Sequence, residues 1–217
     1  MNSINAPRFT QPVDYPALED ISSRLDDLEE MHMIDVINWE QYSYKPQAGF
    51  KIACNSREIF IKYYVREKYV KAEKTGINQA VYEDSCVEFF VAPGDDDIYY
   101  NFEFNSIGAM LAEWGNGRHN RTFMHPSVAG RIRILPGMGT GPFPERAGPQ
   151  NWTLTLALPV DVFLRHKIDK TGGRQFRANF YKCGEKLSHP HYLTWNPVLS
   201  PEPDFHRPGD FGIIRFI

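Results

Sequence analysis

The alternation of hydrophobic and polar positions predicts a chain built mainly of β-strands. The clearest example is the series Ile59, Ile61, Tyr63 and Val65, which occupies every second position. Successive side chains of a strand point to opposite faces of a sheet, so this spacing indicates a strand with one face in the core. The same period of two recurs in residues 86–92, 98–105, 152–158 and 176–181.

The segments between these strands complete the predicted architecture. Residues 93–97 carry Pro, Gly and Asp, which predicts a turn and makes the flanking strands hairpin partners. Residues 17–33, rich in Leu, Asp and Glu, predict one helix whose acidic part, Asp26 to Glu30, faces solvent. Residues 135–150 are rich in glycine and proline and predict a long irregular loop. Strands that follow one another without helices between them predict an antiparallel β-sandwich.

Length and composition agree with a single domain. The chain has 217 residues, and its 42% hydrophobic content is enough for one packed core. Its net charge is -3, so it offers no general basic surface, and neither nucleic acid nor an acidic membrane is expected as a partner. No apolar run approaches the roughly 18 residues of a transmembrane helix, so no membrane span is expected.

The cysteines Cys54, Cys86 and Cys183 are an odd number at wide spacing. That pattern fits neither a disulfide framework nor a CxxC metal site. We therefore expect three small, buried, hydrophobic side chains.

Two other clusters carry weak signals for a metal ion. His189 and His191 flank a proline, but no third ligand can be identified. The acidic turn Asp95 to Asp97 offers oxygen ligands for calcium, yet it lacks the EF-hand spacing. We therefore assign no metal ligands and expect no cofactor to be required, with calcium left as an open alternative.

The local motifs of common enzymes do not occur in the sequence. There is no nucleophile elbow, P-loop, HExxH or dinucleotide fingerprint, so no catalytic residue is assigned. A carboxylate pair among Glu83, Asp84, Glu88 and Glu103 would suit a glycosidase, which needs two carboxyl groups about 5 to 10 Å apart. That separation cannot be read from the sequence, so a hydrolase stays an alternative.

Two sets of side chains favour binding of a flat, polar ligand such as a sugar ring. Asn101, Glu103 and Asn105 share the strand face opposite the core, where carboxylate and amide groups can chelate vicinal hydroxyls. The alternative is an ordinary solvent-facing strand. Near the C-terminus, rings and hydrogen-bonding groups gather among prolines that stiffen the chain. These are Tyr192, Trp195, Phe205, His206, Arg207 and Phe211.

Three ordered motifs carry a resemblance to a known family. They are the runs Val81 to Phe90, Tyr100 to Asn105 and Phe205 to Gly212. Together they resemble carbohydrate-binding module family 9, in particular its branch from sugar-degrading gut bacteria. The match runs from about Trp39 to the end, so residues 39–217 are expected to form the family domain and residues 1–38 an extension packed on it. The resemblance implies an immunoglobulin-like or jelly-roll β-sandwich that holds the end of a glycan between two aromatic rings.

The family's site residues carry over position by position. Its two stacking rings fall on Tyr82 and Phe205, and its hydrogen-bonding acidic residue falls on Glu88. A sugar-contacting arginine of the family falls on Glu103, and an asparagine falls on Glu202. These two departures put the family's preference for reducing-end sugars in doubt and leave room for another sugar or for a calcium-mediated contact.

The sequence therefore predicts non-catalytic binding of a mono- or oligosaccharide. The expected site residues are Tyr82, Glu88, Glu103, Asn105, Trp195, Phe205 and Arg207. The alternatives are a glycoside hydrolase that uses a carboxylate pair, or a protein-interaction domain of a sugar-utilisation system. The first 30 residues lack the order of a signal peptide, which indicates the cytoplasm, whereas glycan capture indicates the periplasm or cell surface after removal of a leader. Both locations stay open, as does the oligomeric state.

Overall fold

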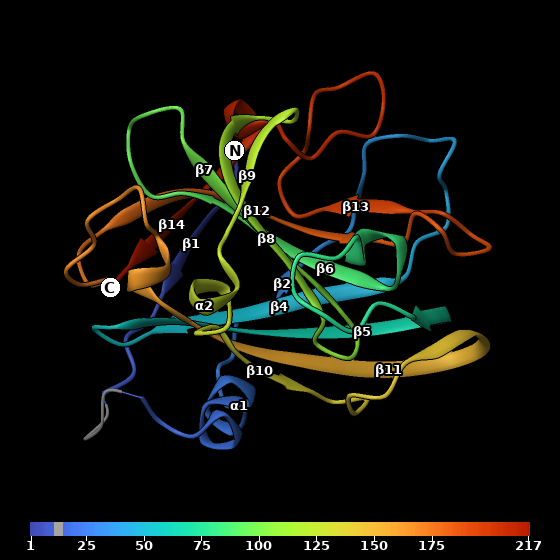
Figure 1. Cartoon of the computed structure of the whole chain (residues 1–217), viewed down its shortest axis with the longest axis horizontal. Coiled ribbons are helices and arrows are strands. Elements are labelled where there is room, and N and C mark those ends of the chain that lie inside the picture. The colour runs from blue at the N-terminus through green and yellow to red at the C-terminus, as the bar shows by residue number, and fades with distance from the viewer. Residues whose placement is uncertain (11–14) are drawn as a thin grey trace.

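The computed structural model describes residues 1–10 and 15–217, which form two β-sheets packed face to face (Figure 1). The first sheet has the order β1 (Ser3–Ala6), β14 (Gly212–Phe216), β12 (Gln175–Cys183), β6 (Cys86–Ala92), β7 (Tyr99–Asn105), β8 (Met110–Gly117) and β9 (Asn120–Phe123). β13 (Tyr192–Thr194) pairs with both β12 and β3 (Val36–Ile37). The second sheet has the order β10 (Arg133–Pro136), β11 (Phe143–Pro159), β5 (Glu58–Ala72), β4 (Gln47–Cys54) and β2 (His32–Met33).

The predicted all-β sandwich is confirmed. The strand pairs of both sheets are antiparallel apart from β1 and β14, which run parallel. The main core lies between the sheets and contains the alternate residues that the sequence pattern assigned to it, such as Ile61, Phe89, Phe102 and Leu156. The hairpin of β6 and β7 also forms as predicted. Of the expected extension, residues 1–38, residues 11–14 lie outside this description, and β1, β2 and β3 belong to the two sheets.

The N-terminal helix is shorter than predicted. α1 covers Leu18–Asp26, and the expectation of a helix to residue 33 is wrong beyond that point. The Lys51 ammonium donates to the carbonyl oxygens of Asp26 and Leu28 at 2.8 and 2.6 Å. These two oxygens therefore accept from Lys51 and not from the backbone N–H groups of a further helical turn. His32 then pairs with Phe50 as part of β2.

The prediction of an irregular loop over residues 135–150 is wrong in part. β10 ends at Pro136, and β11 begins at Phe143 and runs through the prolines that follow. Its pairing with β5 slips twice, between Phe143 and Arg146 and between Ala147 and Gln150. These irregularities let prolines, which cannot donate to the ladder, lie within the strand.

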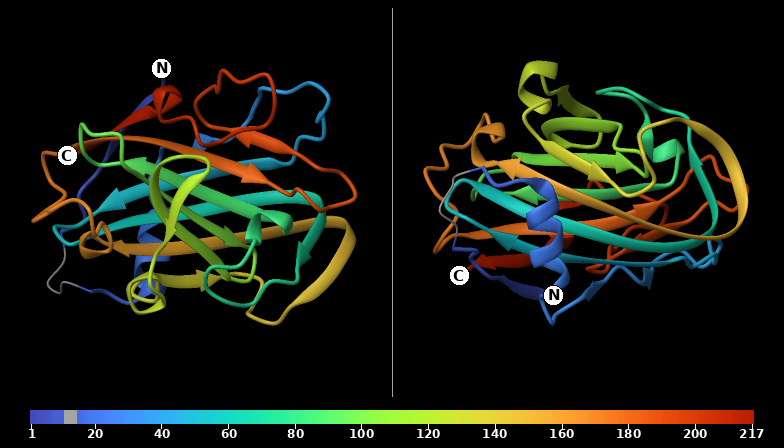
Figure 2. Two further views of the ribbon diagram at one scale, coloured as in Figure 1. Left: turned by 45° about the horizontal axis from the view of Figure 1, so that its top comes forward. Right: turned by 90° about the horizontal axis from the view of Figure 1, so that it is seen from below.

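Each sheet is also covered on its outer face, as the two views in Figure 2 show. α1 packs on the second sheet, where Ile21 and Leu25 contact a small cluster that includes Phe60. On the first sheet, the C-terminal loops and the 3₁₀ helix η1 (Val81–Glu83) cover a separate aromatic cluster, which we call the outer cluster. Its members include Trp39, Val81, Cys86, Phe90, Tyr99, Tyr181, Cys183 and Phe205. The remaining short helices are α2 (Pro126–Ala129), η2 (Val160–Val162) and η3 (Pro208–Asp210).

One ion pair is buried between the two sheets. The Lys182 ammonium lies 3.0 Å from a carboxylate oxygen of Glu67, and both side chains are fully buried. The indole of Trp152 donates to the other Glu67 oxygen at 2.7 Å, and Lys182 also contacts the His191 ring nitrogen at 2.8 Å. Burial and the nearby Lys182 charge hold the pKa of His191 well below its usual value, so the imidazole is neutral.

In the described part of the chain, no helix has the length and apolar character needed to cross a membrane.

Candidate functional site

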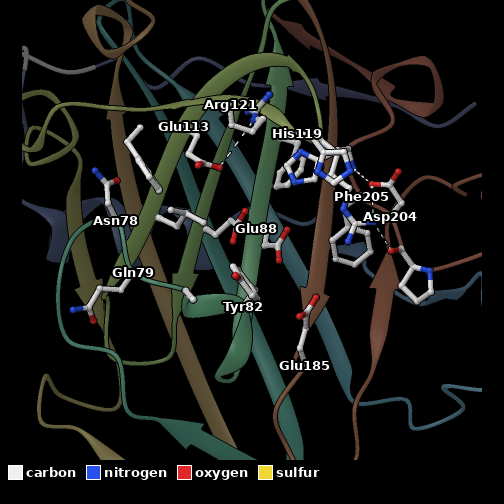
Figure 3. Close-up of a pocket in the computed structure, with 18 of the residues that line it drawn as sticks. Asn78, Gln79, Tyr82, Glu88, Glu113, His119, Arg121, Glu185, Asp204 and Phe205 are labelled. Carbon is white, nitrogen blue, oxygen red and sulfur yellow. Dashed lines mark hydrogen bonds and ion pairs between the residues drawn. The ribbon is translucent and has the colours of Figure 1, made fainter.

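A pocket of about 580 Å³ opens on the outer face of the first sheet (Figure 3). Its floor comes from the outward-facing residues of β6, β7 and β8. Its walls come from the segment that includes η1, from the β8–β9 hairpin, and from the loops on either side of β13. The floor residues are Glu88, Phe90, Glu103, Leu111 and Glu113. The wall residues include Gln79, Tyr82, Arg118, His119, Arg121, Glu185, Tyr192, Asp204, Phe205 and His206.

Strand alternation and register place the acidic side chains on the floor. Val87 and Phe89 point into the main core, so Glu88 between them points outward. Glu88 lies directly opposite Glu103 in the pairing of β6 with β7. Two carboxyl groups are therefore brought to neighbouring positions beneath the pocket.

A buried polar network supports the turn that carries Tyr82. One carboxylate oxygen of Asp84 accepts hydrogen bonds from the backbone N–H groups of Glu73 and Lys74 at 2.9 Å and from the Asn105 amide at 3.0 Å. The Asn105 oxygen in turn accepts from the Ala109 backbone. The structure thus uses Asn105, which was expected to contact ligand, to fix the turn behind the pocket.

Burial sets the protonation state of the floor acids. Glu88 and Glu103 are 2% and 4% exposed, and the structure gives neither an ion-pair partner among the described residues. Desolvation raises the pKa of Glu88 well above its usual value, and it raises the pKa of Glu103 to about 8 against the opposing hydrogen bond from Asn101. Both carboxyl groups therefore hold protons at neutral pH and can donate as well as accept hydrogen bonds.

The more buried of the two arginines that line the pocket comes from β9. Arg121 has a side chain that is 6% exposed, and its guanidinium lies over the Tyr99 ring at 4.2 Å. One terminal nitrogen donates to the Asn101 side chain. Its Nε and other terminal nitrogen, together with one oxygen of Glu103, are buried with no hydrogen-bond partner within the described chain, although Nε lies 4.0 Å from a carboxylate oxygen of Glu113. Such atoms are costly to bury unpaired, so their convergence at one pocket points to a polar ligand.

The two rings carried over from the family differ in how much surface they offer. Phe205 is 8% exposed and stacks on Tyr181, with ring centroids 4.0 Å apart and planes at 8°. Tyr82 is only partly buried and contacts the edge of the outer cluster. Tyr192 meets Phe205 edge-on at 6.1 Å. Figure 3 shows Tyr82 and Phe205 on different walls of the pocket. Tyr82 is the more accessible stacking surface.

His206 completes the wall beside Arg121. Its Nδ1 lies 2.9 Å from the Tyr99 hydroxyl. Burial, helped by the charges of Arg121 and Arg118, lowers the pKa of His206 to about 3, so the ring is neutral at physiological pH. This neutral imidazole adds a hydrogen-bonding group without adding charge.

The structure places two other expected site residues away from the pocket. Trp195 is 5% exposed and packs in the main core against Phe50 and Phe180. Arg207 lies on the surface and pairs with Asp210 at 3.6 Å. Sequence reasoning missed Arg121 and Glu113, because the register that brings β8 and β9 to the floor is not visible in their local pattern.

The histidines and the acidic turn, which carried weak metal signals, each make other contacts. His191 contacts Lys182, and His189 stacks on Tyr69 at 4.1 Å. Asp96 of the acidic turn pairs with His166 at 3.1 Å. The cysteines are free and buried, as predicted.

The chain matches the profile of a family described as Carbohydrate-binding family 9 over residues 22–216. A search of curated proteins returns no match.

Three solved structures share the fold. A protein from Bacteroides uniformis, provisionally assigned as carbohydrate-binding, is 39% identical over 99% of both chains, with a TM-score of 0.95. A family 9 module from Caldicellulosiruptor kristjanssonii in complex with glucose is 14% identical over 100% of this chain and 96% of its own, with a TM-score of 0.54. A structure of a family 9 module from the same organism with cellotriose is 14% identical over 99% and 93%, with a TM-score of 0.51. The two modules share the fold alone.

Proposed function

This chain belongs to carbohydrate-binding family 9, and on that basis we propose that its outer-face pocket binds a sugar non-covalently, without catalysis. Glucose and cellotriose are bound by family modules of the same fold. The single observation that carries the proposal is the group of buried, unpaired polar atoms on Arg121 and Glu103 beside the half-buried ring of Tyr82.

In the proposed complex, one apolar face of a pyranose stacks on Tyr82, and Phe205 forms the opposite wall. The free N–H groups of Arg121 donate to ring hydroxyls, while Glu88 and Glu103, both protonated, donate and accept. This pairing satisfies atoms that have no hydrogen-bond partner in the described part of the chain. A mono- or oligosaccharide is the proposed partner.

Glycoside hydrolysis receives less support from the same geometry. A glycosidase needs one ionised carboxylate and one protonated carboxyl. Burial raises the pKa of both Glu88 and Glu103, so neither is a ready anion at neutral pH. Turnover of a chromogenic glycoside that disappears in Glu88→Gln would favour the hydrolase over the binding module.

Isothermal titration calorimetry tests the proposal. Glucose and cellotriose are titrated first, followed by a wider sugar panel, each with and without calcium because the ion's role is open. We expect heat from at least one sugar and an affinity that falls at least about tenfold, or about 1.4 kcal/mol, in Tyr82→Ala. Tyr15→Ala, an exposed tyrosine that does not line the pocket, is the matched control and keeps the affinity.

Phe205 requires a milder substitution because it also packs on Tyr181. Phe205→Leu keeps an apolar side chain there and is expected to weaken binding less than Tyr82→Ala does. No heat from any sugar would contradict the proposal, and together with a stable oligomer it would favour a protein-interaction domain.

A further inference from the structure

Two cysteines and a glutamate meet behind the pocket floor. Cys86 on β6 lies directly opposite Cys183 on β12, and Glu88 follows two residues along β6 on the same strand face. The Cys183 thiol donates to a Glu88 oxygen at 3.0 Å. The two sulfurs and one Glu88 oxygen all lie within 4.8 Å of one another.

We propose that Cys86, Cys183 and Glu88 form a zinc site at the base of the pocket. Thiolate and carboxylate are both zinc ligands, and bonds of about 2.0 to 2.3 Å place the ligand atoms of one tetrahedral ion roughly 3.3 to 3.8 Å apart. The three ligand atoms lie within 4.8 Å of one another, so they would approach by at most about 1 to 1.5 Å to reach that geometry. Three protein ligands leave a fourth position open, as in zinc sites that accept a further ligand.

Glu88 places the proposed site next to the pocket. It lines the pocket, whereas Cys86 and Cys183 are buried beside it, so an ion that enters the pocket meets the Glu88 carboxyl group first. Glu88 has no cationic partner among the described residues, and zinc would bind its ionised form, so zinc uptake would release the proton that burial otherwise keeps on this carboxyl group.

The competing interpretation is a neutral, hydrogen-bonded trio that only packs the outer cluster. In that case the thiols keep their protons, consistent with burial raising the pKa of Cys86 to about 12. Metal coordination would deprotonate them. The two interpretations differ in whether the reduced protein takes up one equivalent of metal.

The test uses the full chain after reduction, chelation and desalting, titrated with zinc chloride in the absence of sugar. We expect one zinc per chain, and cobalt(II) in its place should give the near-ultraviolet charge-transfer absorption of thiolate ligation. Cys86→Ser and Cys183→Ser should each weaken zinc binding at least about 100-fold, since loss of a ligand exceeds the 10- to 100-fold cost of an outer-sphere change. Cys54→Ser, a buried cysteine in the main core, should bind zinc normally.

Circular dichroism and melting in chelator establish that each variant is folded before its zinc affinity is read. Absence of zinc uptake by the reduced wild-type chain would overturn the proposal, as would uptake unchanged in both serine variants. One free thiol in place of three in the unreduced protein, with no zinc bound after reduction, would overturn it in favour of a Cys86–Cys183 disulfide. Because no sugar is present, this result is independent of the proposed carbohydrate binding.

Discussion

Two sets of buried acidic side chains in this protein have different surroundings. Between the sheets, Glu67 faces the Lys182 ammonium at 3.0 Å and accepts from Trp152, so its charge is compensated. On the pocket floor, Glu88 and Glu103 are almost as deeply buried but have no cationic partner among the described residues. The same residue type therefore stabilises the fold in one place and remains available for a ligand in the other.

Some buried polar groups stabilise the fold, whereas others are available to bind a ligand. A buried ion pair whose two charges compensate each other is costly to break but contributes nothing to ligand recognition. A buried polar atom without a partner costs stability, and such a cost is expected where binding will satisfy the atom. Four substitutions test the distinction.

The largest effect is expected from Lys182→Met. It leaves Glu67 buried without its cation, so the free energy of unfolding should fall by about 3 to 5 kcal/mol. Urea denaturation measures the change. The double variant Glu67→Leu, Lys182→Met should recover much of the loss, because no uncompensated charge remains; a loss below about 1 kcal/mol in the single variant would contradict the comparison.

The second test is the pH dependence of the free energy of unfolding, measured in the presence of a chelator for the wild-type chain and for Glu103→Gln. In the folded state the pKa of Glu103 is about 8, whereas in the unfolded chain the pKa of a glutamate is near 4.5. Between these two pH values, folded Glu103 keeps its proton and the unfolded glutamate has lost it. Stability therefore falls as pH rises between about 4.5 and 8, by up to about 1.4 kcal/mol per pH unit for this group. Glu103→Gln should flatten that slope, whereas the exposed control Glu19→Gln should leave it unchanged.

Arg121→Lys gives a smaller effect that appears in binding. Lysine keeps the charge but loses the free guanidinium N–H groups, so sugar affinity should fall about tenfold, or 1.4 kcal/mol. The free energy of unfolding should change by less than about 1 kcal/mol, because two of the lost donors make no hydrogen bond within the described residues and lysine keeps the positive charge near Glu113. Calorimetry and urea denaturation on the same sample separate the two quantities; a large stability loss with unchanged affinity would place Arg121 with the folding groups.

The smallest effect is expected at a surface pair. Glu83, at the rim near Tyr82, lies 3.0 Å from the Lys74 ammonium, and the side chains of both are about a third exposed or less. Glu83→Gln should cost less than about 1 kcal/mol, as exposed ion pairs do. Thermal melting at low and high salt checks this value, and a cost approaching that of Lys182→Met would mean that burial is not what separates the two classes.

The sequence predicted the direction of side chains better than their environment. Alternation correctly placed Phe102 in the main core and Glu103 opposite to it. It could not show that loops and η1 cover the other face too, so it missed that Asn105 is buried in the turn network. It also could not show that Trp195, next to the irregular C-terminal loops, packs in the main core against Phe50 and Phe180. Arg121 was missed because its approach to the floor depends on the β8–β9 pairing, which no local pattern encodes.

The same limit explains the misjudged helix and loop. The helical pattern continues past Asp26, but a distant lysine, Lys51, caps the chain there. Conversely, prolines in residues 143–150 suggest a loop, yet bulges accommodate them within β11. Tertiary contacts from other strands decided both outcomes, whereas the family motifs located Tyr82, Glu88 and Phe205 around one pocket because motifs summarise tertiary structure.

The stack of Phe205 on Tyr181 has a thermodynamic consequence. The outer cluster already fixes this ring through Tyr181, Trp39 and Tyr192. Its rotational freedom is lost when the chain folds, so little remains to be lost when a ligand arrives. The wall is therefore preorganised. Phe205 offers little exposed area to a ligand, but its fixed ring makes the entropic penalty of association smaller.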